Sequence, residues 1–93
     1  MRIYVSLPIT GYDLEERKAR ALALKKKLER DGHEAVTPFD LDWEDGKDYA
    51  HYMGRDIEEL LRCDAVYLDS GWEKSKGCWL EYWAAKIYKK ILL

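Results

Sequence analysis

The stretch RIYVSLPITG at residues 2–11 decides the fold. Its first half is a short apolar run typical of a buried strand, and the proline and glycine of its second half end that strand in a turn. Asp13 follows the turn and is predicted to cap a helix, with Glu16 three residues later completing a capping box. A strand that passes through a short turn into a helix is the first half of a strand–helix–strand unit.

The rest of the chain continues this alternation. Strands are predicted at residues 2–6, 33–37, 65–68 and 91–93, and helices at residues 13–31, 49–62 and 75–89. Strands that alternate with helices need crossover connections, which make the sheet parallel and place helices on both of its faces. We therefore predict a single α/β domain over residues 1–93. It is a three-layer α/β/α, doubly wound domain of the flavodoxin-like kind with about four short parallel strands.

The same topology predicts where a ligand binds. In open parallel sheets, ligands bind outside the carboxyl ends of the strands, where the strand order reverses. In this chain those ends carry residues 6–11, 37–39 and 69–74. The first of these loops offers Ser6, Thr10 and free backbone N–H groups beside a helix start, which suits one polar or anionic ligand group.

Composition limits the class of partner. Sixteen Lys and Arg against 18 Asp and Glu give a net charge of −2 without a basic stripe, so a nucleic-acid polymer is not expected as a partner. No apolar run approaches the ~20 residues of a membrane span, and the chain starts directly in a strand, which predicts a cytoplasmic protein without membrane contact. Two cysteines and two histidines are scattered, so we expect reduced thiols, no metal and no cofactor.

Aromatic residues make up 13% of the chain, which is high for a small domain. The four tryptophans cannot all be fully buried in so small a core, and some are predicted to line a ligand pocket or a subunit interface: Trp43, Trp72, Trp79 and Trp83. A 93-residue domain with this much apolar surface is expected to form a homodimer or a higher homo-oligomer.

Two acidic residues fall on helix faces that should be apolar. Asp56 lies in register with Tyr52, Met53 and Leu60, and Glu81 interrupts a stripe of small residues on the third helix. An unpaired buried carboxylate costs several kcal/mol or has a raised pKa, so such positions favour a functional role. Both acids also lie near the helix starts, close to the predicted ligand site.

Structural roles are open for the same positions. Each polar residue has an ordinary alternative: Asp56 pairing with Arg55 or Arg62 on the surface, Glu81 pairing with Lys74 or Lys86, Asp69 as a turn residue before Gly71, and Ser75 as a helix cap. Cys63 and Cys78 are read as packing residues.

Taken together, these segments resemble the nucleoside 2-deoxyribosyltransferase-like superfamily. Within it, the chain looks closest to a small bacterial and phage domain family and to the 2′-deoxynucleoside 5′-monophosphate N-glycosidases. The matching pieces span nearly the whole chain in the family's order: IYVSLPITG at 3–11, Asp56 ahead of CDAV at 63–66, GW at 71–72, and SKG at 75–77 followed by Glu81.

The resemblance implies roles for individual residues. Glu81 would be the nucleophile that attacks the anomeric carbon of the deoxyribose, Tyr4 would hold its carboxylate, and Asp56 would handle the proton of the departing base. The implied substrate-binding residues are Ser6, Pro8, Thr10, Gly11, Asp69, Gly71, Trp72, Ser75 and Gly77. Ser75 stands where the nucleotide hydrolases carry a serine for the 5′-phosphate, whereas Pro8 and Thr10 depart from the glycine-rich, arginine-containing turn of those enzymes.

The implied function is cleavage or transfer of the N-glycosidic bond of a 2′-deoxynucleoside or its 5′-monophosphate. A carboxylate beneath the sugar stabilises the developing oxocarbenium ion and can trap it covalently, while a second, protonated carboxyl group assists the leaving base. Two alternatives on the same fold are a non-catalytic nucleotide-binding module and a protein-interaction domain in which the tryptophans form the interface.

Overall fold

The computed structural model describes residues 1–41 and 44–93, so the prediction for Trp43 lies outside the described residues. The elements follow the predicted order: β1 (Arg2–Ser6), α1 (Leu14–Arg30), β2 (Glu34–Val36), the 3₁₀ turn η1 (Pro38–Asp40), α2 (Tyr49–Leu61), β3 (Ala65–Leu68), the 3₁₀ turn η2 (Trp72–Lys74), α3 (Lys76–Ile87) and β4 (Ile91–Leu92).

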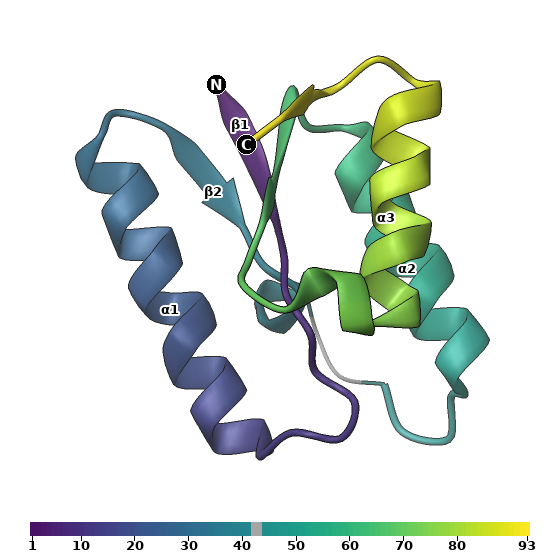
Figure 1. Cartoon of the computed structure of the whole chain (residues 1–93). Helices are drawn as coiled ribbons and strands as arrows, with labels where there is room; N and C mark the ends of the chain where they lie inside the picture. Colours follow the sequence, from purple (N-terminus) through teal and green to yellow (C-terminus); the bar gives the residue numbers. More distant parts are fainter. Residues whose placement is uncertain (42–43) are drawn as a thin grey trace.

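The four strands form one parallel sheet in the order β2-β1-β3-β4. From β1 the chain first adds β2 on one side and then crosses over to β3 on the other, so the strand order reverses between β1 and β3. Helix α1 covers one face of the sheet, and α2 and α3 cover the other (Figure 1). The predicted fold class is confirmed.

Alternation along β1 divides the core between the two faces. Ile3, Val5 and Leu7 pack toward α1 with Ala21, Leu24 and Leu28, together with Ala35 and Ala65 of the neighbouring strands. Tyr4 packs in a second cluster on the α2 and α3 side of the sheet, with Val36, Leu60, Cys63, Val66 and Ala85. The strand period of two therefore delivers Tyr4 to the same side as Glu81.

Helix starts are the part of the prediction that needs correction. Asp13 is the N-cap of α1, but its side chain makes no capping hydrogen bond, so the predicted capping box with Glu16 is wrong. A capping box is found instead at η1, where Thr37 accepts from Phe39 N and Asp40 accepts from Thr37 N. Leu14, the first residue of α1, is half exposed and lines the cleft described below.

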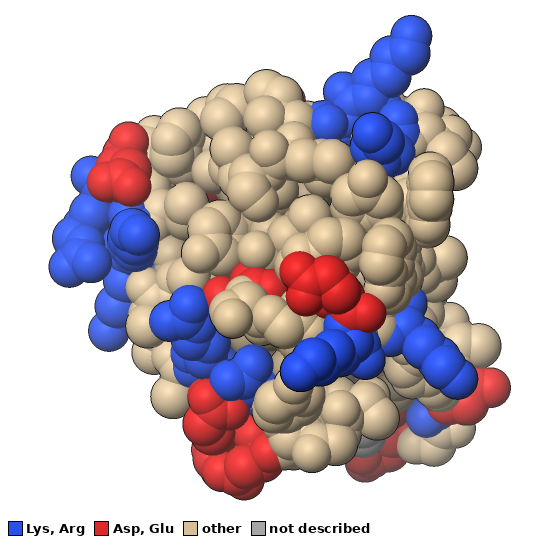
Figure 2. Space-filling model, in the orientation of Figure 1, with Lys and Arg blue, Asp and Glu red and all other residues tan. Residues whose placement is uncertain are grey.

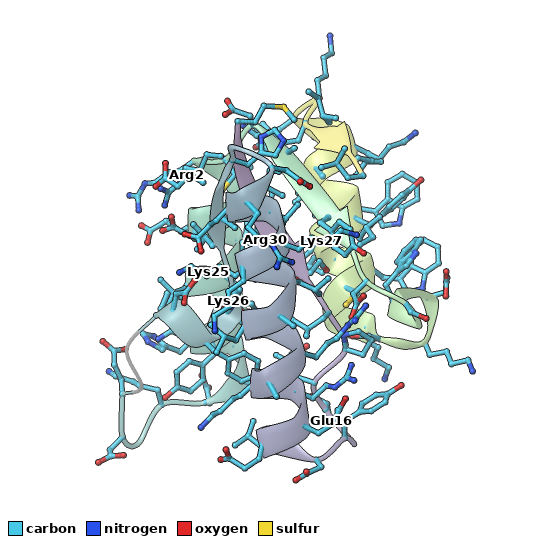
Figure 3. All side chains as sticks on the ribbon, turned by 90° about the vertical axis from the view of Figure 1, so that its left-hand side faces the viewer. Arg2, Glu16, Lys25, Lys26, Lys27 and Arg30 are labelled. Atoms are coloured by element: carbon cyan, nitrogen blue, oxygen red, sulfur yellow. The ribbon has the colours of Figure 1, made fainter. Side chains whose placement is uncertain are left out.

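The two helical layers have different surfaces. The outward side of α1 carries Lys25, Lys26, Lys27 and Arg30, as expected for a helix in water (Figure 3). Much of the face over α3 and β4 is uncharged, with Lys or Arg side chains at its margin (Figure 2). Within the described residues, none of the helices is long and apolar enough to cross a bilayer.

Candidate active site

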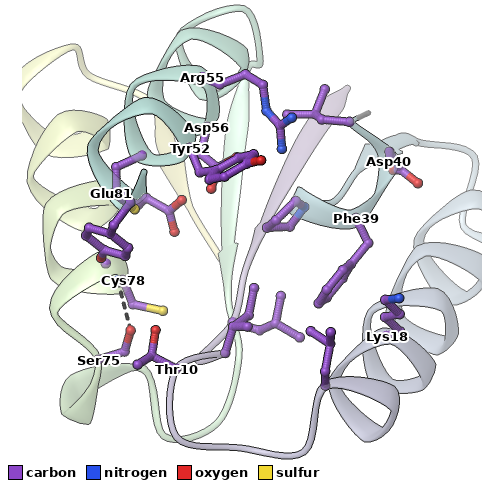
Figure 4. A pocket seen from close by; sticks show the side chains of 18 residues that line it. Thr10, Lys18, Phe39, Asp40, Tyr52, Arg55, Asp56, Ser75, Cys78 and Glu81 are labelled. Carbon is purple, nitrogen blue, oxygen red and sulfur yellow. Dashed lines mark hydrogen bonds between the residues drawn. The ribbon is translucent and has the colours of Figure 1, made fainter. Parts of the chain in front are cut away.

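A cleft of about 640 Å³ opens at the carboxyl ends of the strands. Its walls come from the segments that follow β1 and β2, the first turns of α1, one face of α2 and the first turns of α3 (Figure 4). The location is the one predicted from topology. Helix α1 faces α2 and α3 across this opening, so residues from the beginning, middle and end of the chain meet here.

Glu81 is the most deeply buried acid of the cleft wall, with only 4% of its surface exposed. It lies on the inner face of α3, and its two carboxylate oxygens accept hydrogen bonds from Tyr4 Oη at 2.7 Å and Ser6 Oγ at 2.7 Å. Burial raises the pKa of Glu81 to about 7, with a further upward contribution from Asp56, while the two hydroxyl donors oppose the shift. The alternative in which Glu81 pairs with a surface lysine is wrong.

Asp56 is the second buried carboxyl group of the same cleft. It lies on the inner face of α2, and burial raises its pKa to about 6, partly opposed by the charge of Arg55. Among the described residues, Asp56 Oδ1 has no hydrogen-bond partner. Arg62 pairs with Glu58 and Glu59, so it does not neutralise Asp56. A buried carboxyl oxygen without a partner at a cleft wall is available to a ligand.

Tyr4 connects the sheet to Glu81. Its side chain is fully buried in β1, and burial together with the nearby Glu81 raises the pKa of its phenol well above the usual value. The hydroxyl therefore keeps its proton at physiological pH and acts as a donor to Glu81. Ser6, two residues along the same face of β1, is the second fixed donor.

The first turn of α3 provides the polar end of the cleft. Ser75 Oγ accepts from Cys78 N at 3.2 Å, which confirms the predicted N-cap, and Ser75 also lines the cleft. Gly77 allows α2 to approach: a Cβ at this position would lie 3.1 Å from Tyr49 Oη and 3.4 Å from Met53 Sδ. Its role is therefore close packing of α2 against α3 as well as lining the cleft.

The predicted substrate-binding residues divide into those near the cleft and those outside its walls. Thr10, Ser75 and Gly77 line the cleft, and Ser6 lies behind Glu81. The others do not line it: Pro8, Gly11, Asp69, Gly71 and Trp72. Trp72 packs away into an aromatic cluster, stacked on Tyr82 with ring centroids 5.0 Å apart.

Asp69 has a structural partner. Arg20 donates to its two carboxylate oxygens at 2.8 and 3.1 Å, tying α1 to the end of β3. Burial alone would raise the pKa of Asp69, but the guanidinium of Arg20 and the backbone N–H of Ser70 outweigh it and lower the pKa. The carboxylate is thus already paired on the α1 side of the sheet.

Neither cysteine is paired with another, and both are buried. Burial raises the pKa of Cys78, which lines the cleft, so its thiol stays protonated near neutral pH. Within residues 1–41 and 44–93, no three His, Cys, Asp or Glu side chains are grouped so that they could hold a metal ion.

The family described as "Domain of unknown function (DUF4406)" matches residues 1–93. The chain belongs to this family. No curated protein matches its sequence. Among solved structures, it is similar to 2-deoxyribosyltransferase from the psychrotolerant bacterium Bacillus psychrosaccharolyticus, with a TM-score of 0.69 and 17% identity over 99% of this chain and 69% of that one.

A second similar structure is 2-desoxiribosyltransferase from Leishmania mexicana. Its TM-score is 0.71 with 18% identity, over 99% of this chain and 61% of that chain. The DUF4406 chain thus spans less than two thirds of the Leishmania protein. At these identities the two comparisons establish a shared fold.

Several cleft residues of this DUF4406 chain were missed by the sequence interpretation. The missed residues include Lys18, Tyr49, Tyr52, Arg55 and Cys78, whereas Phe39 belongs to the segment 37–39 that was predicted to reach the site. Tyr49, Tyr52 and Met53 lie at helical spacing from Asp56, and this stripe was assigned wholly to core packing. The signal that could have distinguished a core stripe from a cleft wall is Asp56, the acid at the end of this stripe. A stripe that includes Asp56 is partly the wall of a cleft.

Proposed function

We propose that this protein cleaves or transfers the N-glycosidic bond of a 2′-deoxynucleoside or its 5′-monophosphate, with Glu81 as the nucleophile. The observation that carries the proposal is the arrangement of Glu81: a buried carboxylate in a cleft wall, held by the hydroxyls of Tyr4 and Ser6. Asp56, a second acid of raised pKa, lines the same cleft. Two carboxyl groups of unlike environment are the equipment of a retaining glycosidase.

In the first step, an ionised oxygen of Glu81 forms a bond to the anomeric carbon of the sugar. The carbon–nitrogen bond breaks, and its electron pair goes to the base. Asp56, in its protonated form, gives its proton to that base, which departs neutral. The developing positive charge on the sugar ring is stabilised by the carboxylate, and the two hydroxyl donors keep this carboxylate pointed at one place.

In the second step, water or another base attacks the same anomeric carbon and the bond to Glu81 breaks. The ionised Asp56 accepts the proton that the attacking group loses, so both carboxyl groups return to their initial states. Attack by water gives hydrolysis, and attack by a base gives transfer. A pKa of about 6 suits Asp56 to both roles, because the group gains and loses a proton easily near neutral pH.

The walls of the cleft support one orientation of the substrate. Ser75, Thr10 and Glu81 lie toward α3, whereas Phe39 and Lys18 lie on the side of η1 and α1 (Figure 4). The sugar and any 5′-phosphate fit the polar side, where the N-terminus of α3 favours an anion. A planar base fits against the ring of Phe39. The fold similarity to a 2-deoxyribosyltransferase used to make nucleosides supports this substrate class.

The test is incubation of the protein with 2′-deoxynucleosides and their 5′-monophosphates, followed by chromatography for free base. We expect free base with an equal amount of the freed sugar, or a new nucleoside when a second base is added. Glu81→Gln should lower the rate by ~10²-fold or more. A preparation that binds these compounds in calorimetry but releases no base would instead support the non-catalytic nucleotide-binding module. Failure both to bind and to cleave would reject the nucleoside proposal.

A further inference from the structure

Helix α3 has an apolar surface on both sides. Its inner face buries Cys78, Glu81 and Ala85 against the sheet and α2. Its outer face, defined here as Trp79, Leu80, Trp83 and Ile87, is exposed by 39, 51, 53 and 67%. A helix that is apolar all round is normally buried all round, whereas a surface helix has a charged outer side, as α1 does (Figure 3).

The exposed apolar residues are concentrated in this part of the chain. Of the twelve large apolar side chains that are exposed in the described residues, seven fall between residues 79 and 93. The four side chains of the outer face of α3 together expose roughly 450 Å², taking ~150–250 Å² for a whole large side chain, which is more than half of what one partner contributes to a standard interface. An interface of standard size takes ~800 Å² from each partner.

The aromatic rings around this face are already ordered. Trp72, Trp79 and Tyr82 contact one another with ring centroids 4.7 to 5.4 Å apart, and Trp83 contacts Tyr82 at 5.4 Å. Trp79 Nε1 donates to Glu73 O at 2.7 Å, so its polar atom already has a partner within the chain. Covering Trp79 would therefore bury apolar surface without leaving a donor unsatisfied, and with little loss of side-chain entropy.

We propose that the outer face of α3 is the interface of a symmetric homodimer. In this dimer two α3 helices pack antiparallel about a two-fold axis near Trp83, so that Trp79 contacts the partner's Ile87. The antiparallel arrangement opposes the two helix dipoles favourably. An isologous contact covers the face of both copies at once and leaves no apolar surface for further growth.

The lysines near this face suit a rim. Lys76 lies in the first turn of α3, and Lys86 lies in its last turn with the ammonium 6.0 Å from the ring centroid of Tyr82. Lys90 Nζ donates to Leu61 O at 3.0 Å. Two of these lysines are thus held by their own chain, and the centre of the face is left apolar. An apolar centre with a charged rim is the usual anatomy of a protein–protein interface.

A lipid surface would also accept tryptophan and lysine side chains, but it is less well matched. Tryptophans at a membrane interface keep the indole N–H toward the wet side, and that of Trp79 is directed to Glu73 O. The proposal is independent of the proposed catalytic function. It bears on the cleft only because α3 carries Ser75 and Glu81 on its other side.

The test uses light scattering and sedimentation over a dilution series, with Leu80→Glu as the disrupting variant and Leu22→Glu as its control. Both leucines are 51% exposed on the outer side of a helix, and only Leu80 belongs to the proposed interface. Wild type and Leu22→Glu should have twice the 11.0 kDa chain mass at ~10 µM, with a Tm that rises with protein concentration. Leu80→Glu should need at least tenfold higher concentration to dimerise, and Trp83→Glu should be more severe because two like charges meet at the axis.

Three results would overturn the proposal. One is a wild type that stays at 11.0 kDa with a concentration-independent Tm up to ~100 µM. Another is a wild-type dimer whose dissociation constant is no more affected by Leu80→Glu and Trp83→Glu than by Leu22→Glu. That result would place the interface elsewhere. The third is a monomer in solution that sediments with vesicles of anionic phospholipid and loses this binding in Leu80→Glu, which would assign the face to a lipid surface.

Discussion

Tyr4 donates its phenol hydroxyl to Glu81 Oε2 at 2.7 Å, joining the first strand to the third helix across 77 positions of sequence. Both side chains are buried, so this bond forms only when α3 is packed correctly against the sheet. Ser6 repeats the arrangement from the next position on the same side of β1. The geometry of the proposed nucleophile is therefore set by β1, an inner strand of the sheet, and not by a loop.

The first prediction concerns this bond. Tyr4→Phe removes one donor that lowers the pKa of Glu81, so that pKa should rise further. We expect kcat/KM at pH 6.5 to fall by about 10- to 100-fold, and the limb of its pH profile that is set by the pKa of Glu81 to move to higher pH. Tyr67→Phe is the matched control, because Tyr67 packs with the α1-side cluster on the other face of the sheet. A pH profile of Tyr4→Phe with both limbs where wild type has them would show that the phenol does not tune the carboxylate.

The second prediction is a bell-shaped pH profile. The nucleophile must be ionised and the acid protonated, and the pKa values of about 7 for Glu81 and about 6 for Asp56 limit the competent state on both sides. Activity should therefore peak between pH 6 and 7, with apparent values that belong to the coupled pair. Asp56→Asn should lower the overall rate and abolish the alkaline limb, leaving the single ionisation of Glu81. An alkaline limb that survives in Asp56→Asn would assign the acid to another group.

Sequence periodicity predicted the parts of the fold that depend on local pattern. The apolar run at 65–68 became β3 with the same bounds, and the alternation of strands and helices determined the layers and the position of the cleft. Asp56 and Glu81 were found because helical spacing places them among residues that must face inward. The ends of elements were less predictable: α3 stops at Ile87, two residues before Lys89 with its left-handed φ of 57°.

Contacts between distant segments were beyond the pattern. The pairing of Arg20 with Asp69 joins residues 49 positions apart, and only the packed structure shows that α1 passes the end of β3. Phe39 reaches the cleft because η1 turns the chain after β2. On the outer face of α3, only Trp79 and Trp83 were predicted from the sequence to lie at a ligand pocket or a subunit interface, although Leu80 and Ile87 stand at helical spacing from them. This face became informative only when the opposite face was seen to be buried.

The third prediction tests the role of Asp69. Arg20→Met keeps the aliphatic bulk of the side chain but leaves the buried carboxylate of Asp69 without its cation, which should lower the free energy of unfolding at pH 7 by about 1–3 kcal/mol. The folded pKa of Asp69 is lowered, so this contribution is present above its unfolded pKa and is lost as pH falls through the folded value. In urea titrations, the free energies of unfolding of wild type and Arg20→Met should thus differ by a large amount at pH 7 and by a small amount at pH 3.

Arg30→Met, on the exposed last turn of the same helix, is the control for the loss of a positive charge. It should change stability by no more than about 0.5 kcal/mol. If Arg20→Met left stability intact at pH 7 and altered KM instead, Asp69 would return to the list of substrate-binding residues.

The fourth prediction separates the capping and phosphate roles of Ser75. Ser75→Asp preserves the N-cap of α3 but places a negative charge beside the proposed phosphate position, so Tm should stay nearly constant. The ratio of kcat/KM for a deoxynucleoside monophosphate to that for the nucleoside should fall at least tenfold. Ser70→Asp adds the same charge outside the cleft walls and should leave the ratio unchanged. Equal losses on both substrates in Ser75→Asp would place the phosphate elsewhere.

The last prediction links the proposed nucleophile to stability. Glu81 has a folded pKa of about 7 against an ordinary value of 4.5, so the folded protein holds a proton that the unfolded chain has released. Stability from this group is fully present below pH 4.5 and is lost as pH rises toward 7, by about 3 kcal/mol at most. Glu81→Gln is neutral at every pH and escapes this loss, while its amide can still accept from Tyr4.

The Tm of Glu81→Gln should accordingly match wild type near pH 4 and exceed it by on the order of 10 °C near pH 8. Glu29→Gln, the same change on the exposed side of α1, should show no such divergence with pH. The rate of base release should show the opposite order: Glu81→Gln should release base more slowly than wild type at each pH where it is the more stable protein. If the carboxylate of Glu81 had a structural role instead, its replacement by an amide should lower the stability of the protein. A carboxylate kept for chemistry lowers stability at neutral pH, and a Tm for Glu81→Gln below wild type at pH 8 would reject that role.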